Sequence, residues 1–397
     1  MTYSYWQLKG GTPVPKKTRP EKNKYDIAII GAGITGVAAA YYLSKFGCPD
    51  HIVLDKHFSG YGASGRNAGF LLSGLAEPYS RLVTGMGNDS AREIMTATIE
   101  NHDLIADSIN ENKINCGYKR SGSYHLAVTE VERLELIETV DLLVQDGFKA
   151  RFINTESIEP FKGKDQYYGG FYNPMDGCLD PFAFVQGLGS GLNIIEGAEV
   201  QSIEKFGDRL KITTGEFSVE AEMAILATNA YSPMVDGYFK NLIFPVRGQM
   251  VAVSAKDRPE LGDATYYANF GYDYFRNENS RQFLMGGLRD KFVNEEVGYE
   301  DKITPNLQKG LEDYIKSHIG IKQFEATHRW SGVMATTTDG LPLVGALPHN
   351  SSVIVAAGMN GHGFGLGMII ARDLARAIIG DPTSDLLKRF SLNRIAR

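Results

Sequence analysis

Cysteine, long apolar runs and basic charge are all scarce in this sequence. The three cysteines, Cys48, Cys116 and Cys178, form no C-x-x-C pair. An odd number of cysteines without such a pair indicates a protein of a reducing compartment rather than one built on disulfides. No uncharged apolar run reaches the ~18–20 residues that a membrane helix needs, and the first residues lack the basic start and apolar core of a secretory leader. These absences predict a cytoplasmic protein without an integral membrane segment.

The charge balance and the histidines argue against two further classes of protein. Lys and Arg total 41 against 47 Asp and Glu, which gives a net charge of −6. A nucleic-acid binder would need a basic surface to neutralise phosphates, so none is predicted. The eight histidines are scattered without the spacing of ligands, so no metal site is predicted. At 397 residues, of which 43% are hydrophobic, the chain can fold as two or three lobes.

The clearest local pattern lies in residues 26–55. An apolar run meets glycines at Gly31, Gly33 and Gly36, a helical stretch follows, and a second apolar run closes on Asp55. In such a unit the glycines permit the sharp turn, the close approach of a pyrophosphate and tight packing of the helix on the strand. The helix N-terminus attracts phosphate, and an acid about 20 residues on can accept from ribose hydroxyls. The pattern predicts a dinucleotide site and leaves NAD(P) and FAD both open.

Two other glycine-rich stretches are candidates for contact with the same ligand. Residues 59–74 carry too little bulk for a core and suit a backbone that lies against a flat molecule. Residues 358–367 lead into a predicted helix over about 367–379, so a second helix N-terminus would face the ligand.

The rest of the chain carries less specific patterns. Residues 91–114 and 130–147 have helical spacing and no evident chemistry. Residues 243–283 alternate and are rich in aromatics, most of which we expect in a sheet core, with one or two lining a pocket. Residues 330–345 look turn-rich, and residues 1–24 are predicted to be a polar arm that wraps the surface.

Six motifs in order resemble the D-amino-acid-oxidase-like FAD oxidoreductases, a family that includes glycine, sarcosine and gamma-glutamylputrescine oxidases. They are the Gly31–Gly36 turn, G-A-S-G-R-N-A-G at 62–69, A-T-N-A-Y at 227–231, P-V-R-G-Q at 245–249, W-S-G…T-x-D-G-L-P-L-V-G at 330–345 and A-A-G-x-x-G-H-G at 356–363. The pairing of the second and third motifs looks closest to the gamma-glutamylputrescine oxidase branch. The resemblance covers nearly the whole chain and implies FAD rather than NAD.

The resemblance also implies a set of cofactor-binding residues. The ADP half would be held by Gly31, Gly33, Gly36 and Asp55, with Val200 and Ala227 on the adenine side. The pyrophosphate and flavin would lie along Ser64, Arg66, Asn67, Ala68 and Gly69, and the pyrimidine edge along Gly361, His362, Gly363 and Phe364. A helix N-terminus there would stabilise negative charge on the reduced cofactor.

The implied fold is α/β, with a Rossmann-type FAD-binding domain and a substrate domain built on an antiparallel or mixed sheet. We expect a discontinuous FAD-binding domain of residues 25–85, 151–236 and 326–397. The substrate domain would be residues 86–150 and 237–325, and residues 1–24 would be the arm.

The position that binds a substrate carboxylate in related amino-acid oxidases is changed in this chain. An arginine in a W-x-G-x-R pattern makes a two-pronged ion pair there, whereas this chain has Met334. Either another cation, such as Arg247 or Arg276, takes over, or the substrate has no carboxylate beside its amine. No classical base is expected, so Tyr274, Arg247 and Met334 are predicted as pocket-lining catalytic residues. Tyr274 and Arg247 have rival interpretations as a core phenol and a surface ion pair.

The resemblance bears on the cofactor link as well. Sarcosine-oxidase-like members tether FAD through a cysteine near this turn, where Val333 and Met334 offer no thiol, so noncovalent FAD is expected. His57 is a remote alternative anchor. His362 either contacts the cofactor or only caps its turn, and His328 is interpreted as structural.

A second family feature concerns the electron acceptor. Some members carry a lysine, before a glycine pair, that helps oxygen accept electrons. Here Leu284 and Met285 precede that pair, which weakens the case for a fast oxidase.

The predicted activity is oxidation of a C–N bond in an amine or amino acid to an imine, by hydride transfer to flavin N5. The partners would be that small molecule and oxygen or another electron acceptor. The alternatives are a dehydrogenase of the same fold that passes electrons to a quinone or protein, and a noncatalytic FAD-binding assembly protein.

Overall fold

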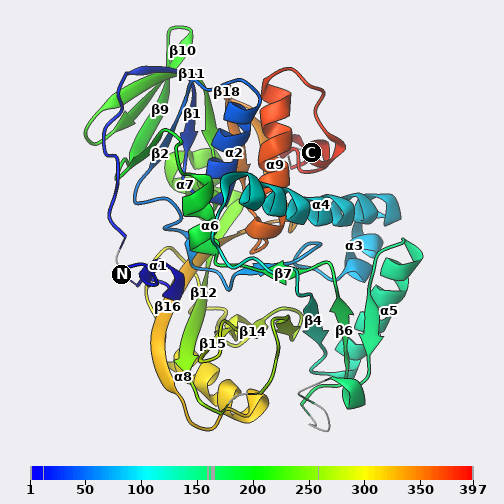
Figure 1. The fold of residues 1–397 in the computed structure, drawn as a ribbon. Coiled ribbons are helices and arrows are strands. Elements are labelled where there is room, and N and C mark those ends of the chain that lie inside the picture. The colour runs from blue at the N-terminus through cyan, green and yellow to red at the C-terminus, as the bar shows by residue number, and fades with distance from the viewer. Residues whose placement is uncertain (1, 12, 159–160, 162–165, 258, 396–397) are drawn as a thin grey trace.

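Two mixed sheets form the framework of the chain (Figure 1). The computed structural model describes residues 2–11, 13–158, 161, 166–257 and 259–395. Within these residues each sheet has eight strands, and a two-stranded ladder of β3 (Phe70–Leu71) and β7 (Gly177–Cys178) lies apart from them. The predicted α/β class with a mixed second sheet is confirmed.

The first sheet contains the predicted dinucleotide unit. Its strands run in the order β17 (Leu343–Leu347), β18 (Asn350–Ala357), β11 (Ser218–Leu226), β1 (Lys24–Ile30), β2 (His51–Asp55) and β8 (Ile194–Glu196), and β9 (Val200–Phe206) and β10 (Arg209–Thr214) extend β11. β18, β11, β1, β2 and β8 are parallel to their neighbours in this order. The carboxyl ends of β1 and β2, where ligands bind in such sheets, therefore meet at one edge.

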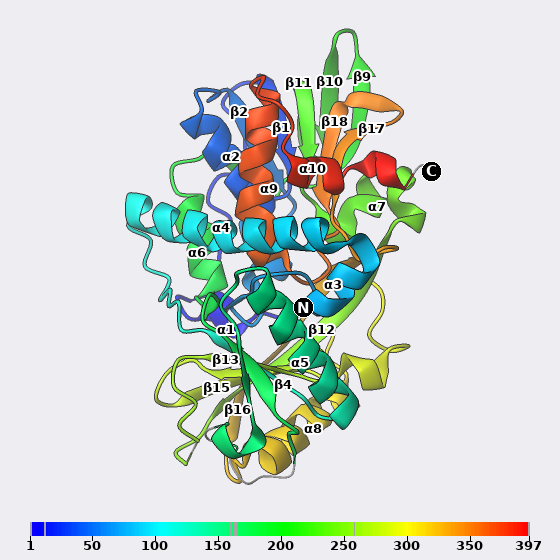
Figure 2. The same cartoon turned by 90° about the vertical axis from the view of Figure 1, so that its right-hand side faces the viewer.

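Two helices cover this sheet at its centre. α2 (Ile34–Lys45) follows β1, and α9 (Gly363–Ile378) follows β18 and packs against α2. Both are apolar on most sides, because each lies between the sheet and further helices. Figure 2 shows α4 (Asn88–Asn112) running across the two, and α6 (Pro181–Leu188) beside it. The predicted helix at the C-terminal glycines is confirmed and begins four residues earlier than expected, at Gly363.

The second sheet forms the lower half of Figure 1. Its order is β16 (Glu325–Thr337), β12 (Ile243–Ser254), β15 (Gln282–Gly287), β14 (Asp273–Asn277), β13 (Thr265–Ala268), β4 (Ser123–Leu126), β6 (Gly170–Asn173) and β5 (Arg151–Ile153). Its aromatic residues pack with α8 (Pro305–Tyr314) and the π-turn Ile315–Ile319. α3 (Tyr79–Met86) and α5 (Glu130–Gln145) pack together beside β6.

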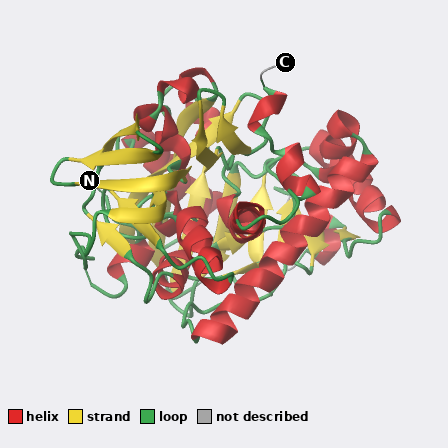
Figure 3. Cartoon of the chain, turned by 90° about the horizontal axis from the view of Figure 1, so that it is seen from above, coloured by secondary structure: helices red, strands yellow, loops and turns green. Residues whose placement is uncertain are grey.

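The remaining helices are short. They are α1 (Tyr5–Leu8), α7 (Ser232–Val235), α10 (Asp385–Arg389) and the 3-10 turns Ala63–Gly65, Thr155–Ser157, Asn229–Tyr231, Gly237–Asn241, Arg289–Phe292 and Leu392–Arg394. Seen from above, the strands lie beside a layer of helices that runs along one side of the molecule (Figure 3). None of the helices within the described residues is long and apolar enough to span a bilayer.

The N-terminal arm differs from its prediction. Ser4, Trp6 and Gln7 are 0, 1 and 1% exposed, so the start of the arm is core rather than surface wrapping. Ser4 caps α1, and its hydroxyl donates to the carbonyl of Gly65 over 2.5 Å. Trp6 packs with Phe70 and Trp330. Because those partners lie 60 or more residues away in the chain, the local polarity of the arm did not indicate its burial.

Strand pairing also departs from the expected boundaries. The stretch that looked turn-rich begins as the long strand β16, which pairs with β12 from Ile243 to Ser254. β5 and β6 pair in the second sheet rather than with the dinucleotide unit. The division into two domains stays a prediction, with these three strands belonging to the second sheet.

Candidate active site

One cavity of about 980 Å³ is lined by residues of both sheets. Its walls include the β1–α2 turn, the run 61–68, the carboxyl end of β11, the turn before α9, and β12, β14 and β16 of the second sheet. The three glycine-rich stretches singled out in the sequence therefore meet around one space.

The β1–α2 turn forms a cradle that only glycine permits. Gly31 has φ of +105°, and a Cβ built on it would lie 2.7 Å from the carbonyl oxygen of Ala227. A Cβ on Gly33 would lie 3.0 Å from Oγ of Ser64, which accepts from the N–H of Ile34 at 2.9 Å. Both glycines line the cavity, so the positive end of α2 is open to an anion there.

Asp55 closes this end of the cavity. Its Oδ2 accepts from the N–H of Ala32 and its Oδ1 from the N–H of His57, each at 2.7 Å. Burial raises the pKa of Asp55 to about 6 despite these hydrogen bonds. Val200 and Ala227 line the same end. The arrangement places a carboxylate where ribose hydroxyls would donate to it.

The run 62–69 is fixed by its own polar side chains. Asn67 Nδ2 donates to the carbonyls of Ala63 and Ser64 at 3.0 Å each, and its Oδ1 accepts from the N–H of Gly69 at 2.8 Å. Arg66, which is 5% exposed, donates to the carbonyl of Ser331 at 2.9 Å. The loop is thus held between the N-terminal arm and β16.

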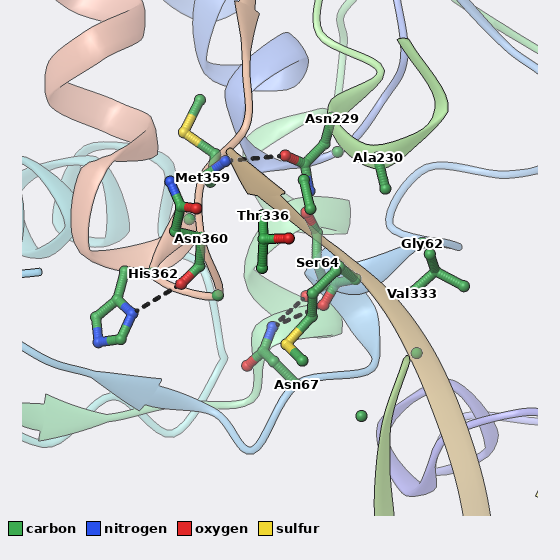
Figure 4. A pocket seen from close by; sticks show the side chains of 18 of the residues that line it. Gly62, Ser64, Asn67, Asn229, Ala230, Val333, Thr336, Met359, Asn360 and His362 are labelled. Carbon is green, nitrogen blue, oxygen red and sulfur yellow. Dashed lines mark hydrogen bonds between the residues drawn. The ribbon is translucent and has the colours of Figure 1, made fainter. Parts of the chain in front are cut away.

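Two asparagines shape the turn before α9, and sequence reasoning gave neither a role. Asn229, at φ of +47°, accepts on Oδ1 from the N–H groups of Gly358 and Met359 at 3.0 and 3.1 Å. Asn360, also at φ of +47°, accepts from the N–H of Thr337 at 2.9 Å. Figure 4 shows both beside Thr336, with Ser64 and Asn67 across the cavity. Asparagine tolerates the left-handed region, which is the one local hint that these positions are turns.

His362 lies at the start of α9 and lines the cavity. Its Nδ1 is 3.3 Å from the carbonyl of Asn360, and burial lowers its pKa. The neutral ring also borders a side cavity of about 80 Å³ that reaches His125. Gly361, Gly363 and Phe364 line the main cavity beside it, so this helix N-terminus faces the same space as that of α2.

Tyr274 and Met334 meet at the other end of the cavity. Tyr274 crosses Gly286, where a Cβ would lie 2.3 Å from its ring, and a Cβ on Gly248 would lie 3.6 Å from its hydroxyl and 3.1 Å from Cε of Met334. The missing side chain of Gly248 opens a groove in the second sheet, and the ring of Tyr274 fills the space over Gly286. Met250 and Phe70 complete an apolar wall.

Three predicted site residues do not line the cavity. Gly36 packs α2 onto the turn, since its Cβ would lie 1.9 Å from the carbonyl oxygen of Gly31. Gly69 packs against the carbonyl of Leu179, where a Cβ would lie 2.3 Å away. Arg247, predicted as a pocket residue, is 0% exposed and pairs through Nε with Glu296 at 2.9 Å. It lies on the opposite side of β12 and is a structural ion pair.

The other groups weighed in the sequence also lie outside the substrate end. Arg276 pairs with Glu278 and covers the ring of Trp6 at 5.2 Å. His57 lies against Tyr61 with the two rings tilted by 31°, beside Asp55. His328 contacts Tyr5 edge-on. In the described part of the chain no three histidine, cysteine or acidic side chains are grouped so that they could hold a metal ion.

These features fit a bound dinucleotide. The cradle at Gly31 and Gly33 is space that any larger residue would fill, and the helix N-termini of α2 and α9 border one cavity with the Asp55 carboxylate. A flat ring system would lie between the turn before α9 and the groove crossed by Tyr274.

The comparisons with known proteins agree with this geometry. A model of the FAD dependent oxidoreductase family matches residues 26–377. The chain is 25% identical over 374 residues to the probable oxidoreductase OrdL of Haemophilus influenzae, which covers 90% of this chain and 83% of that protein. It is 24% identical over 392 residues to gamma-glutamylputrescine oxidoreductase of Escherichia coli, covering 96% and 89%.

Solved structures share the fold. Glycine oxidase from Geobacillus kaustophilus superposes with a TM-score of 0.79 at 23% identity, covering 94% of this chain and 99% of the other. L-proline dehydrogenase from P. horikoshii gives a TM-score of 0.79 at 20% identity, covering 97% and 99%.

Proposed function

This chain belongs to the family of FAD-dependent oxidoreductases, and from that premise we propose that it oxidises a C–N bond of a small amine or amino acid to an imine. Relatives that are named for their substrates act on gamma-glutamylputrescine, glycine and sarcosine, all of which carry such a bond. The observation that carries the proposal is the cavity itself, which joins a dinucleotide cradle to an apolar groove walled by Tyr274 and Met334.

Different residues along this cavity would bind different parts of FAD. Gly31, Gly33 and Asp55 would hold the ADP half of FAD, and residues 62–68 would lie along the rest. When bound, FAD supplies the acceptor for the hydrogen and electron pair that leave the carbon beside the amine. The N-terminus of α9, with neutral His362 at its start, would stabilise negative charge on the part of FAD bound beside it.

The groove would bind the substrate and favour its neutral amine form. Met334, Met250 and Phe70 are apolar and exclude water, which favours the neutral amine over the ammonium ion. Tyr274 reaches the groove with its hydroxyl, and burial raises its pKa to about 12, so it stays protonated and can donate to or accept from the substrate. No base is required for this step, because the lone pair of a neutral amine forms the C=N bond as the hydrogen on the adjacent carbon leaves with its electron pair. The iminium ion that results then releases a proton to water to give the imine.

Met334 limits the kind of substrate that binds here. A cation at this position would grip a carboxylate beside the amine, whereas a thioether cannot form an ion pair. We therefore favour an amine, or an amino acid whose carboxylate lies farther from the reacting bond, over a simple α-amino acid.

A second candidate is a dehydrogenase that passes the electrons to a quinone or a protein. Lys56 is the one lysine among the described residues that line the cavity, and it pairs with Glu199 at 2.7 Å beside Asp55. The apolar groove therefore has no lysine to favour electron transfer to oxygen. A cytoplasmic location remains the expectation drawn from the sequence.

One experiment separates these possibilities. The holoenzyme is mixed without oxygen with a panel of amines, amino acids and N-methyl compounds, and the absorbance of oxidised flavin is followed. Bleaching by any of them supports the proposal, and a panel that leaves the colour intact favours a noncatalytic FAD protein. Recovery of colour in air identifies an oxidase, and failure to recover identifies the dehydrogenase. Acid precipitation that leaves FAD in solution supports a noncovalent cofactor.

A further inference from the structure

The cations around the cavity differ in whether they already have a carboxylate partner. Among the described residues, the lysine and arginines that line it are Lys56, Arg66, Arg81 and Arg289. Lys56 pairs with Glu199 at 2.7 Å, Arg66 with Asp301 at 3.3 Å, and Arg81 with Glu77 and Glu135 at 3.0 and 2.6 Å.

Arg289 alone of these four has no carboxylate within ion-pair distance in the described structure. Its guanidinium lies over the ring of Tyr272, 5.2 Å from the ring centre. A guanidinium held on an aromatic face keeps its donors available for an anion in the plane of its fork. The cavity thus contains one cation whose charge is not neutralised by the protein.

The backbone that presents Arg289 is fixed. The preceding residue, Leu288, is 3% exposed and has φ of +59°. Its N–H donates to the carbonyl of Tyr272 at 3.0 Å and to Oδ1 of Asp273 at 3.2 Å. A non-glycine residue in the left-handed region is strained and persists where its surroundings determine it. Arg289 therefore starts from a rigid point at the end of β15.

Arg289 lies beside the groove and not at its centre. β15 and β16 flank β12, with Gly286 paired to Met250 and Met334 paired to Val246. Neighbouring strands are ~4.8 Å apart, so the backbones of β15 and β16 are separated by about 10 Å. Arg289 covers the ring of Tyr272, which precedes β14. β14 pairs with β15 on the side away from β12. The positive charge of Arg289 partly opposes the rise that burial causes in the pKa of Tyr274, which reaches the groove from β14.

We propose that Arg289 binds a carboxylate that the substrate carries several bonds away from the oxidised C–N bond. The inference rests on the proposed function for the reacting end, and it assigns the substrate class as ω-carboxy amines. Apolar Met334 at one end and unpaired Arg289 at the other match a molecule with an amine head and an acidic tail. In an α-amino acid both groups share one carbon, so the carboxylate would have to lie against the apolar wall.

The test uses ligands that separate the two ends. Pentanoate carries the tail and no amine, so its binding to the oxidised holoenzyme, seen as a change in flavin absorbance, does not depend on turnover. Anaerobic reduction is then measured with 5-aminopentanoate and with n-pentylamine, which differ only in the carboxylate. The variants are Arg289→Gln, Arg289→Lys and, as the matched control, Arg281→Gln. Arg281 lies on the same hairpin, is exposed and does not line the cavity.

Arg289→Gln should weaken pentanoate and 5-aminopentanoate about 10- to 100-fold. Pentylamine should change less than about twofold, Arg289→Lys should recover part of the affinity, and Arg281→Gln should match the wild type. FAD content and the midpoint of thermal unfolding establish that each variant is folded.

The inference is overturned if the wild type shows no pentanoate-dependent change, if Arg289→Gln binds pentanoate normally, or if it loses pentylamine to the same extent. If no amine bleaches the flavin, the proposed function fails, while the pentanoate titration still decides whether Arg289 is an acid-binding site.

Discussion

Replacing Trp6 by alanine tests whether the N-terminal arm is part of the cofactor site. Trp6 is 1% exposed, packs with Ala68, Phe70 and Trp330, and donates from Nε1 to the carbonyl of Asn67 at 2.8 Å. Truncating a buried tryptophan costs about 3–5 kcal/mol. Trp6→Phe keeps an aromatic ring and leaves the Asn67 carbonyl without its donor, which should cost about 1–2 kcal/mol.

Loss of the Trp6 side chain should also weaken the binding of FAD. Asn67 and Ala68 line the cavity, and their loop is held between the arm and β16. Loss of the tryptophan frees this loop, so the apoprotein must order it again on binding FAD. We expect Trp6→Ala to bind FAD more weakly than Trp6→Phe, and both more weakly than the wild type.

The assays are urea unfolding of the apoprotein, followed by circular dichroism, and titration of the apoprotein with FAD, followed by flavin fluorescence. Val14→Ala is the matched control, because Val14 belongs to the same arm and is 72% exposed. It should change the stability by less than about 0.5 kcal/mol. If Trp6→Ala lowers the stability by less than about 1 kcal/mol and binds FAD normally, the arm does not support the site and the reasoning is refuted.

Three other perturbations test the geometry. Gly36→Ala places a methyl group 1.9 Å from a carbonyl oxygen and should abolish FAD retention on a desalting column, whereas Gly85→Ala, in a helix with nothing within 4 Å, should keep FAD and melt no lower than the wild type. Glu296→Gln leaves the fully buried Arg247 unpaired and should cost about 3–5 kcal/mol in urea unfolding, with a smaller loss arguing that water reaches the pair. Asp55 has a pKa of about 6 in the free protein. Ribose hydroxyls favour its ionised form, so FAD affinity should rise with pH through that value and be flat in Asp55→Asn. A wild-type affinity independent of pH would contradict the role of this carboxylate.

The dinucleotide end was predictable because its determinants are local. Gly31, Gly33 and Asp55 lie within one strand–turn–helix–strand unit, so their spacing in sequence fixes their spacing in the fold. The turn before α9 was found for the same reason. Asn229 and Asn360 were missed, since hydrogen bonds across 129 residues to Asn229 and across 23 residues to Asn360 leave no local pattern.

The substrate end was less predictable because its walls come from separate segments. Arg289 follows β15, Met334 lies in β16 and Phe70 in β3, and nothing near any of them indicates the others. The prediction for the start of the arm was wrong for the same reason. Trp6 lies in a polar segment, and only its contacts near residues 67 and 330 make it core.

The position of Arg247 shows that the alternation of side chains along β12 determines which residues line the site. In a strand, successive side chains point to opposite faces, so a shift of one residue exchanges the two sets. Val246, Gly248 and Met250 line the cavity, whereas Arg247 and Gln249 are both 0% exposed and donate to the Glu296 carboxylate. The glycine beside the arginine was already a reason to place the open face at 248 and to turn Arg247 away from it. With Arg247 buried, Arg276 paired to Glu278 and Met334 apolar, the charge that faces the substrate is that of Arg289.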